Sequence, residues 1–577
     1  MSHNVQHQIA AIMRRRGGFS FGTAMRLLAP YSPRLAYNFI DPANSLFQGN
    51  TLTPVTSVTN PIRVVVDQTQ GAFSNPGSEI YTSPPNFSDA SWSIVSAGIS
   101  KSGQTITRTT NDGGVARSGL SIGKIYFVRI SYSKTNGTSV FGVGDGTGAI
   151  YYSSTAETGV LEGYFVSASV TIYLRIGVAA DVVTVNSISV REIPGNHARA
   201  SSDAKRPLFA RYPATGRRNL LTQTEQFGSP LWIRGNSLQI DLSQLDVEGG
   251  TRAVRLRKTT TALQSVYQNL ATGTYRNSIF VKADTVNRIG FSAGASPNLI
   301  IDVVTNSVVA NSGTLTSVTI EPLTDGWCRI SYVNSDGTAL YMWPTDSSTL
   351  VFTTTSATAS VFVCLPQAES GSASATAYQK VVTSADITEA GVRDVYASLY
   401  DGSDDCLQVS GFDLSDTDEV TVIAGARKLS DAATAVLLEH SASWLSASGS
   451  FVSAAPDSAL RYSAASRGSA AWALDQVAST SSTTYNAPNT VVYATTHDIA
   501  NDRTLLYLNG TLINTATGDK GTGNFSNNTL NIGGRNNSAS LPFNGYLHYL
   551  FICGAIVPDD ILTRIYRGLG PRIGLTV

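Results

Sequence analysis

The sequence predicts an all-β protein made of several sandwich domains. Apolar and polar residues alternate along short runs such as 126–132 and 172–176, and a period of two is typical of strands with one covered face. Only 14% of the residues are charged, and the polarity comes mainly from Ser, Thr and Asn, which suits short strands joined by turns. The length of 577 residues is too great for one core and indicates about three or four domains.

Residues 1–45 form the first predicted element, a short basic segment with helical parts. Apolar residues share a helical face at 9–13 and another at 25–28, and Gly17-Gly18 separates the two pieces. Neither piece is long enough to be a stable helix alone. Five arginines precede the first acidic residue of the chain: Arg14, Arg15, Arg16, Arg26 and Arg34. We expect an anchor that docks on a larger assembly, with a disordered basic tail as the alternative.

Two further segments are predicted to be connections. Residues 46–72 contain Pro54 and Pro61, which favour extended backbone and interrupt strand pairing, so we expect a connecting arm there. Residues 194–217 are rich in Lys and Arg and contain two more prolines, which is typical of an interdomain linker.

The segments 73–193 and 218–383 begin in the same way. In each, a Phe is followed five positions later by a Trp, and a series of short alternating runs comes next. The two pairs are Phe87 with Trp92 and Phe227 with Trp232. This repeat predicts one β-module used twice. Because the two Trp residues occupy equivalent places, we expect them to be core residues rather than sugar-binding platforms.

Residues 384–577 have a different pattern. Asn509-Gly510 lies between two apolar runs, and this dipeptide favours the type I′ turn of a β-hairpin because both residues tolerate positive φ. The sequence of residues 558–566 predicts a short terminal helix.

Several motifs resemble those of known families. Residues 219–227 with Trp232, 326–330 and 367–371 resemble the carbohydrate-binding-type jelly rolls of tailed-bacteriophage virion proteins. The order of motifs at 505–513, 531–534, 542–552 and 558–566 resembles that of laminin G-like, concanavalin A-like sandwiches. The resemblance implies tandem jelly-roll β-sandwiches at 73–193 and 218–383, followed by a concanavalin A-like sandwich at 384–577.

The resemblance also implies a function. It suggests a bacteriophage virion protein, a tail fibre or head fibre, that contacts host surface polysaccharide and attaches to other virion proteins through its basic N-terminus. By analogy such a protein is a homo-oligomer, a trimer in many appendages, and is assembled into the virion in the host cytoplasm. Two alternatives stay open: a purely structural head or tail decoration or spacer, and a tailspike that depolymerises polysaccharide.

Several other classes of function lack support in the sequence. The six histidines are scattered, no nucleophile or phosphate-binding motif is present, and residues 390–577 lack the closely spaced carboxylates of concanavalin A-like glucanases, so we do not expect an enzyme. A net charge of zero gives no general attraction to nucleic acid. No apolar run is long enough for a membrane helix or a signal peptide. The four cysteines are far apart, and we expect Cys328 and Cys364 to be small buried hydrophobes.

The densest acidic cluster comprises Asp401, Asp404 and Asp405. Carboxylates are ligands that calcium prefers, so a calcium site is possible here and is the only cofactor that the sequence suggests. The alternative is that Asp-Gly-Ser-Asp-Asp forms a tight turn through hydrogen bonds between side chain and backbone.

Sugar binding needs flat aromatic side chains for the ring faces and amides or carboxylates for the hydroxyls. Trp343 and Trp444 stand beside Pro344 and Ser443, which favours exposed positions for them. With Asn536 and Asn537 they are the predicted carbohydrate-binding residues.

Overall fold

The computed structural model confirms the predicted all-β fold class. It describes residues 19–577 apart from 43–44, 50, 71–72, 74–75, 111, 148, 178–179, 263, 295–296, 351–355, 445, 481–484 and 538–539. The chain forms two compact units. One contains the residues up to Phe209 together with Tyr396–Val577, and the other is Ala210–Val395.

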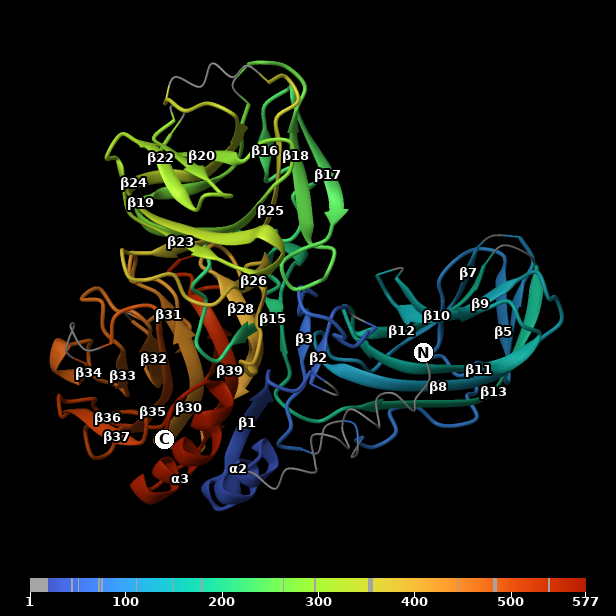
Figure 1. Cartoon of the computed structure of the whole chain (residues 1–577). Coiled ribbons are helices and arrows are strands. Elements are labelled where there is room, and N and C mark those ends of the chain that lie inside the picture. Colours follow the sequence, from blue (N-terminus) through green and yellow to red (C-terminus); the bar gives the residue numbers. More distant parts are fainter. Residues whose placement is uncertain are drawn as a thin grey trace. The chain divides into compact units, whose positions relative to one another are not determined.

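The main body of the first unit is a sandwich of two large sheets (Figure 1). The first sheet contains β28 (Asp394–Asp401), β39 (Asn544–Cys553), β30 (Glu419–Lys428), β35 (Asn489–Asp498), β36 (Arg503–Leu508) and β37 (Thr511–Ala516), with β1 (Pro33–Asn38) paired to β39. The second contains β2 (Leu46–Phe47), β3 (Val64–Val65), β14 (Ala198–Arg199), β29 (Leu407–Asp413), β38 (Asn527–Ile532), β31 (Val436–His440), β32 (Ser450–Ala454), β33 (Ser463–Arg467) and β34 (Val477–Ser479).

Three distant parts of the sequence share the core of this sandwich. Leu35, Val65 and Ala198 are buried in one cluster with Leu407 and Leu547. The predicted arm supplies β2 and β3, and the predicted linker supplies β14, so these segments are strands of the sandwich rather than simple connections. The short strands cover the edge of β29, which would otherwise present unpaired backbone groups. The sandwich therefore extends well beyond the predicted range of 384–577.

The described part of the predicted anchor also belongs to this sandwich. Helix α2 (Phe21–Leu28) starts at Ser20, whose Oγ accepts a hydrogen bond of 3.1 Å from the backbone N of Thr23. The buried face of α2 packs with the C-terminal helix α3 (Asp559–Leu569) on the outer side of the first sheet, and Figure 1 shows the two helices side by side. This part of the N-terminal segment is thus ordered by its own chain.

The first predicted module is an insertion between β3 and β14. It has two antiparallel sheets of five strands that share one core. One contains β10 (Ile150–Ser154), β9 (Val140–Asp145), β12 (Thr171–Gly177), β7 (Gly113–Ser118) and β4 (Ser93–Ile94). The other contains β11 (Thr158–Val166), β8 (Ile125–Lys134), β13 (Asp181–Glu192), β6 (Thr105–Arg108) and β5 (Ile99–Ser102).

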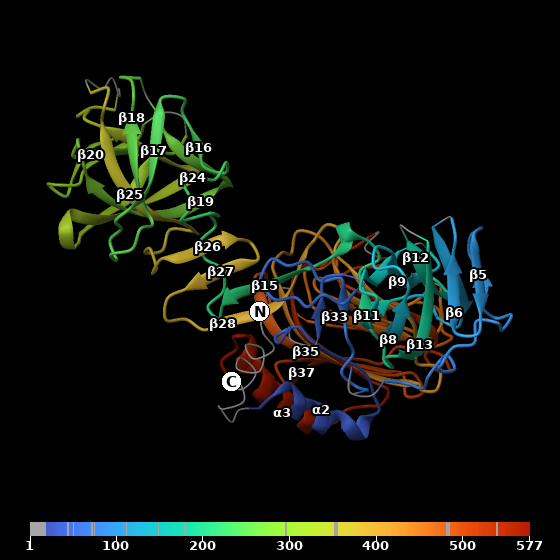
Figure 2. The ribbon, with the colours of Figure 1, turned by 90° about the vertical axis from the view of Figure 1, so that its right-hand side faces the viewer.

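The second unit contains the second module and is inserted between Phe209 and Tyr396. Its strands are β16 (Ile233–Arg234), β17 (Leu238–Gln244), β18 (Ala253–Lys258), β19 (Val266–Ala283), β20 (Arg288–Ser292), β21 (Leu299–Asp302), β22 (Ser307–Asn311), β23 (Leu315–Pro322), β24 (Trp327–Thr345) and β25 (Ser360–Ser370). The long strands β19 and β24 change register around the pair Gly273 and Gly337 and thereby contact two sets of neighbours. The strands β26 (Gln379–Thr383), β27 (Asp386–Glu389) and β15 (Leu208–Pro213) belong to the first sheet of the main sandwich and extend it beyond β28. Figure 2 shows β17, β18 and β25 next to one another.

The repeated aromatic pairs are core residues, as predicted. Trp92 and Trp232 are both buried. The ring centroids of Phe87 and Trp92 are 5.0 Å apart, and those of Phe227 and Trp232 are 4.6 Å apart. Each Trp packs in the core of its own module.

Candidate functional site

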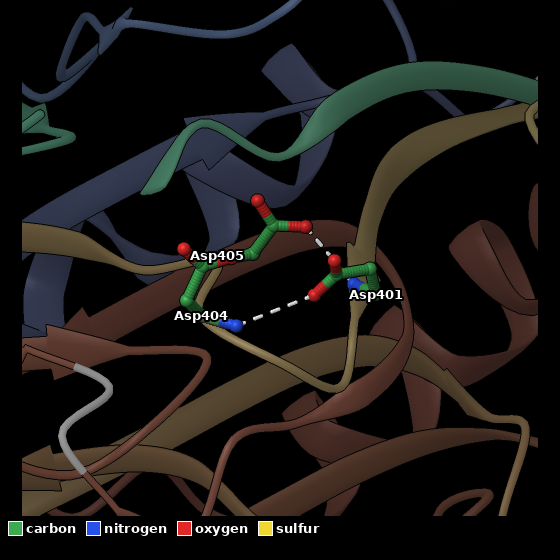
Figure 3. Close-up of side chains that lie close together, drawn as sticks. All are labelled: Asp401, Asp404 and Asp405. Atoms are coloured by element: carbon green, nitrogen blue, oxygen red, sulfur yellow. Dashed lines mark hydrogen bonds between the residues drawn. The ribbon is translucent and has the colours of Figure 1, made fainter. Parts of the chain in front are cut away.

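The predicted acidic cluster lies in the turn between β28 and β29. Carboxylate oxygens of Asp401, Asp404 and Asp405 all lie within 4.8 Å of one another, and Figure 3 shows the three side chains converging. Asp401 is exposed, whereas Asp405 is buried.

Hydrogen bonds to backbone hold this turn together. Oδ1 of Asp401 accepts from the backbone N of Ser403 at 2.8 Å, and Oδ2 of Asp405 accepts from the backbone N of Asp401 at 2.9 Å. Gly402 has a φ of +78°, which suits glycine. The predicted turn chemistry is confirmed.

The electrostatics of the turn centre on Asp405. Burial raises the pKa of its carboxyl to about 7, and the negative charges of Asp401 and Asp404 also raise it. The hydrogen bond from the backbone of Asp401 lowers this pKa but does not offset the increase. The three carboxylates are suitable donors for calcium, but they are few beside the six to eight oxygens that calcium takes, and two of them already accept backbone hydrogen bonds. The donor set therefore fits a calcium ion only in part.

The predicted residues Asn536 and Asn537 lie in the loop after β38. Both have positive φ, and Asn536 is exposed. The backbone N of Asn537 donates to Oδ1 of Asn531 at 3.0 Å, and its side chain contacts Ser201 through a 2.7 Å bond from Nδ2 to Oγ. Lys205 donates from Nζ to the carbonyl of Asn537.

The structure brings the acidic turn and the asparagine loop together. The backbone N of Cys406 donates to the carbonyl of Lys205 at 3.1 Å. A Cβ atom on Gly533 would lie 2.3 Å from the ring of Tyr400 and 3.2 Å from the carbonyl oxygen of Asp405, and the φ of Gly533 is +91°, so glycine is required where the two loops meet. We call residues 201–205, 401–406 and 533–537 the polar loop cluster. Ser201 and Lys205 lie in the predicted linker, and only the tertiary structure assigns them to this cluster.

The two predicted aromatic platforms are not at the surface, and this expectation was wrong. Trp343 is 2% exposed and packs against Ile300, because β24 continues through Pro344, which pairs with Ile289 instead of ending the strand. Trp444 is 6% exposed and its ring lies 5.3 Å from that of Trp472. Neither indole is placed to stack on a sugar.

The arginines predicted to dock on other virion proteins have different surroundings. Nη2 of Arg34 lies 2.5 Å from Oδ2 of Asp416 in the same sandwich, so its positive charge is paired within the chain. Arg26 is exposed on α2 and donates to Oγ1 of Thr23 at 3.1 Å. Arg14, Arg15 and Arg16 lie outside the described residues.

The cysteines and the described histidines lie in the interior. All four cysteines are buried and free, as predicted for Cys328 and Cys364, and burial raises the pKa of both of these thiols to about 12. The described histidines are His197, His440, His497 and His548, and all four are buried. Burial lowers the pKa of His440 and His548 to about 4 and that of His497 to about 3. Within the described part of the chain, no helix is long and apolar enough to cross a membrane.

Comparison with known proteins identifies no family. No family model matches the chain, and no curated protein matches it. Among solved structures, the CBM40 module of the Ruminococcus gnavus IT-sialidase bound to α2,3-sialyllactose is 18% identical and covers 26% of this chain and 83% of its own, with a TM-score of 0.22. The tandem CBM22 domains of Paenibacillus barcinonensis Xyn10C are 11% identical over 52% of this chain and 100% of their own, with a TM-score of 0.20. Domains LG4-5 of the mouse laminin α1 chain are 11% identical and cover 51% of this chain and 86% of their own, with a TM-score of 0.21.

These structural neighbours are carbohydrate-binding modules and laminin G domains. The chain is a multidomain β-sandwich protein with a polar loop cluster at the end of its main sandwich.

Proposed function

We propose that the chain is a bacteriophage virion appendage that binds host surface glycans through the polar loop cluster. One observation carries the glycan-binding part of this proposal. Carboxylate, amide, hydroxyl and ammonium groups from three separate segments meet in one place, with Asp401 and Asn536 exposed. Groups of these kinds bind sugar hydroxyls by donating and accepting hydrogen bonds.

A site of this kind is weak when it acts alone, because the exposed polar groups are already hydrated. Several copies held on one particle gain affinity through their high effective concentration. The proposal therefore includes a homo-oligomer, a trimer by analogy, that attaches to the virion through the basic N-terminal residues. The sequence resemblance to virion proteins supports this part, and imaging of the particle that carries the chain is its test.

The glycan-binding proposal is tested with the full chain on bacterial cells and on an array of bacterial surface polysaccharides. The double variant Asp401→Ala with Asn536→Ala removes exposed groups of the cluster. The matched control is Thr511→Ala, an exposed position on β37. We expect the double variant to lose at least tenfold in binding and the control to bind like the wild type.

Three results would contradict the proposal. Equal binding by all three proteins would place the glycan contact outside the cluster, and release of reducing ends from a polysaccharide would favour a depolymerase. Absence of binding by the wild type would favour a decoration or spacer. Circular dichroism of each variant establishes that a loss of binding does not come from unfolding.

A further inference from the structure

A second polar site lies in the other unit, on the module that contains Trp232. A groove of about 480 Å³ runs along β16 and the start of β17. Its polar lining comes from Arg234, Asn236, Gln239 and Asp241. This volume is in the range of ligand-binding clefts, and Arg234, Asn236 and Gln239 are all exposed to solvent.

The guanidinium of Arg234 has no hydrogen-bond or ion-pair partner among the residues that the structure describes. Neighbouring arginines of the same module are paired. Nε of Arg255 lies 2.5 Å from Oδ2 of Asp284, and Nε of Arg257 lies 3.7 Å from Oδ2 of Asp241. Arg234 therefore offers all its donors to a ligand.

The charges around the groove favour a single negative charge on the ligand. Among the described residues that line the groove, Asp241 is the one carboxylate, and nitrogens of Arg255 and Arg257 lie 4.0 Å and 3.7 Å from its Oδ2. Its charge is thereby compensated, while that of Arg234 is not. A carboxylate matches the planar guanidinium fork with two parallel hydrogen bonds. The single unpaired guanidinium of Arg234 balances one negative charge, whereas a doubly charged phosphate would leave a charge unbalanced in the groove.

The neutral groups of the groove favour a sugar as the carrier of that carboxylate. The amide of Asn236 can donate to and accept from hydroxyl groups. Oε1 of Gln239 already accepts a hydrogen bond from Nη2 of Arg257, so Gln239 contributes chiefly the N–H donors of its amide. The groove is open to solvent along these side chains, which suits a segment of a polymer rather than an enclosed small molecule.

The first module supplies an internal comparison. The second residue after the repeated Trp is Arg234 in β16 but Ile94 in β4, and Ile94 is 48% exposed. The next strand starts with a buried residue in each module, Leu238 in β17 and Ile99 in β5. The residue that follows is Gln239 in the second module but Ser100 in the first. The two copies keep the same core aromatics and differ at these surface positions, so the charged groove is a feature of the second copy.

We propose that this groove binds the carboxylated sugars of an acidic polysaccharide, with Arg234 holding the carboxylate. The site is separate from the polar loop cluster, and the inference rests on the proposed glycan-binding function only in assuming that the ligand is a glycan.

The test is calorimetry with the full chain and three polysaccharides that contain uronates, called polyuronates below: polygalacturonate, alginate and the alternating copolymer hyaluronan. Each polymer is compared with its carboxyl-reduced form. We expect at least one polyuronate to bind, at least tenfold loss of affinity on carboxyl reduction, and a similar loss in Arg234→Ile, which introduces the residue of the first module. Arg234→Lys keeps the charge without the fork and should lose less.

The matched control is Arg129→Ile, an exposed arginine on β8 of the first module. The proposal is overturned if no polyuronate binds, if Arg234→Ile binds like the wild type, or if Arg129→Ile loses as much. Failure of the two proposals is distinguishable. If Arg234→Ile loses binding while the loop-cluster variant binds normally, only the proposed role of the polar loop cluster is contradicted. If the loop-cluster variant loses binding while Arg234→Ile binds normally, only the proposed groove site is contradicted.

Discussion

Val65 of β3 lies opposite Ala198 of β14 in an antiparallel pair, although the whole first module separates them in the sequence. Arg199 of the same short strand pairs with Gln408 of β29, which joins this pair to the C-terminal strands. The N-terminal and C-terminal parts of the chain are therefore one folding unit. Because of this relationship, the modules are insertions into a single sandwich.

The first prediction concerns truncation. A fragment of residues 384–577 lacks buried residues such as Leu35 and Tyr37 and the strands β1, β2, β3, β14, β15 and β26, so it exposes apolar core surface. We expect it to aggregate or to show no cooperative unfolding by circular dichroism. The fragment Ala210–Val395 has a core of its own and should unfold cooperatively. A soluble, cooperative 384–577 fragment would show that the added strands are dispensable.

The second prediction concerns the repeated core aromatics. Replacing a buried Trp by Ala removes a large apolar side chain and leaves a cavity, which costs about 3–5 kcal/mol. Because Trp232 and Trp92 are equally buried, both Trp→Ala variants should lose stability in this range in urea unfolding of the full chain. The control is Trp472→Ala, since Trp472 is only partly buried. A loss below about 1 kcal/mol at Trp232 would contradict a core role.

The third prediction concerns acid stability. The pKa of His440 and His548 in the folded chain is about 4, below the value near 6.5 of an unfolded chain. Between these values the unfolded chain binds protons that the folded chain does not, so the free energy of unfolding falls as pH falls from about 6.5 to 4. Each of these histidines contributes about 3 kcal/mol to this loss.

Denaturant unfolding at pH 7 and pH 4.5 measures that loss. The variant His440→Gln keeps a polar side chain that does not titrate, so its stability should depend less on pH than that of the wild type. An identical pH dependence in the two proteins would contradict the assignment.

The fourth prediction concerns Asp405 and has the opposite sign. Its folded pKa of about 7 lies above the unfolded value near 3.9, so the folded chain binds the extra proton between these values and loses stability as pH rises toward 7. Asp405→Asn keeps an oxygen that accepts the hydrogen bond from Asp401 and carries no charge. We expect this variant to be more stable than the wild type at pH 8 and equal to it at pH 4. Calcium added to the wild type at pH 8 should raise its stability only if the turn binds the ion.

Local pattern and composition were sufficient for several features of this protein. The period of two predicted the all-β class, because a strand with one covered face must alternate. The spacing of Phe227 and Trp232, matched by Phe87 and Trp92, predicted two related cores. The sequence Asp-Gly-Ser-Asp-Asp predicted a turn held by side-chain to backbone hydrogen bonds, and these form.

Other features depend on contacts between distant segments. Strands such as β14 have only two residues, too few for any periodic pattern, and they form because β29 offers an unpaired edge. The burial of Trp343 depends on its packing against Ile300, which local sequence does not reveal. The loops that carry Lys205, Asp405 and Asn537 converge only through the sandwich. Local sequence defines which strands and turns are possible, whereas long-range pairing and burial decide which residues reach the surface together.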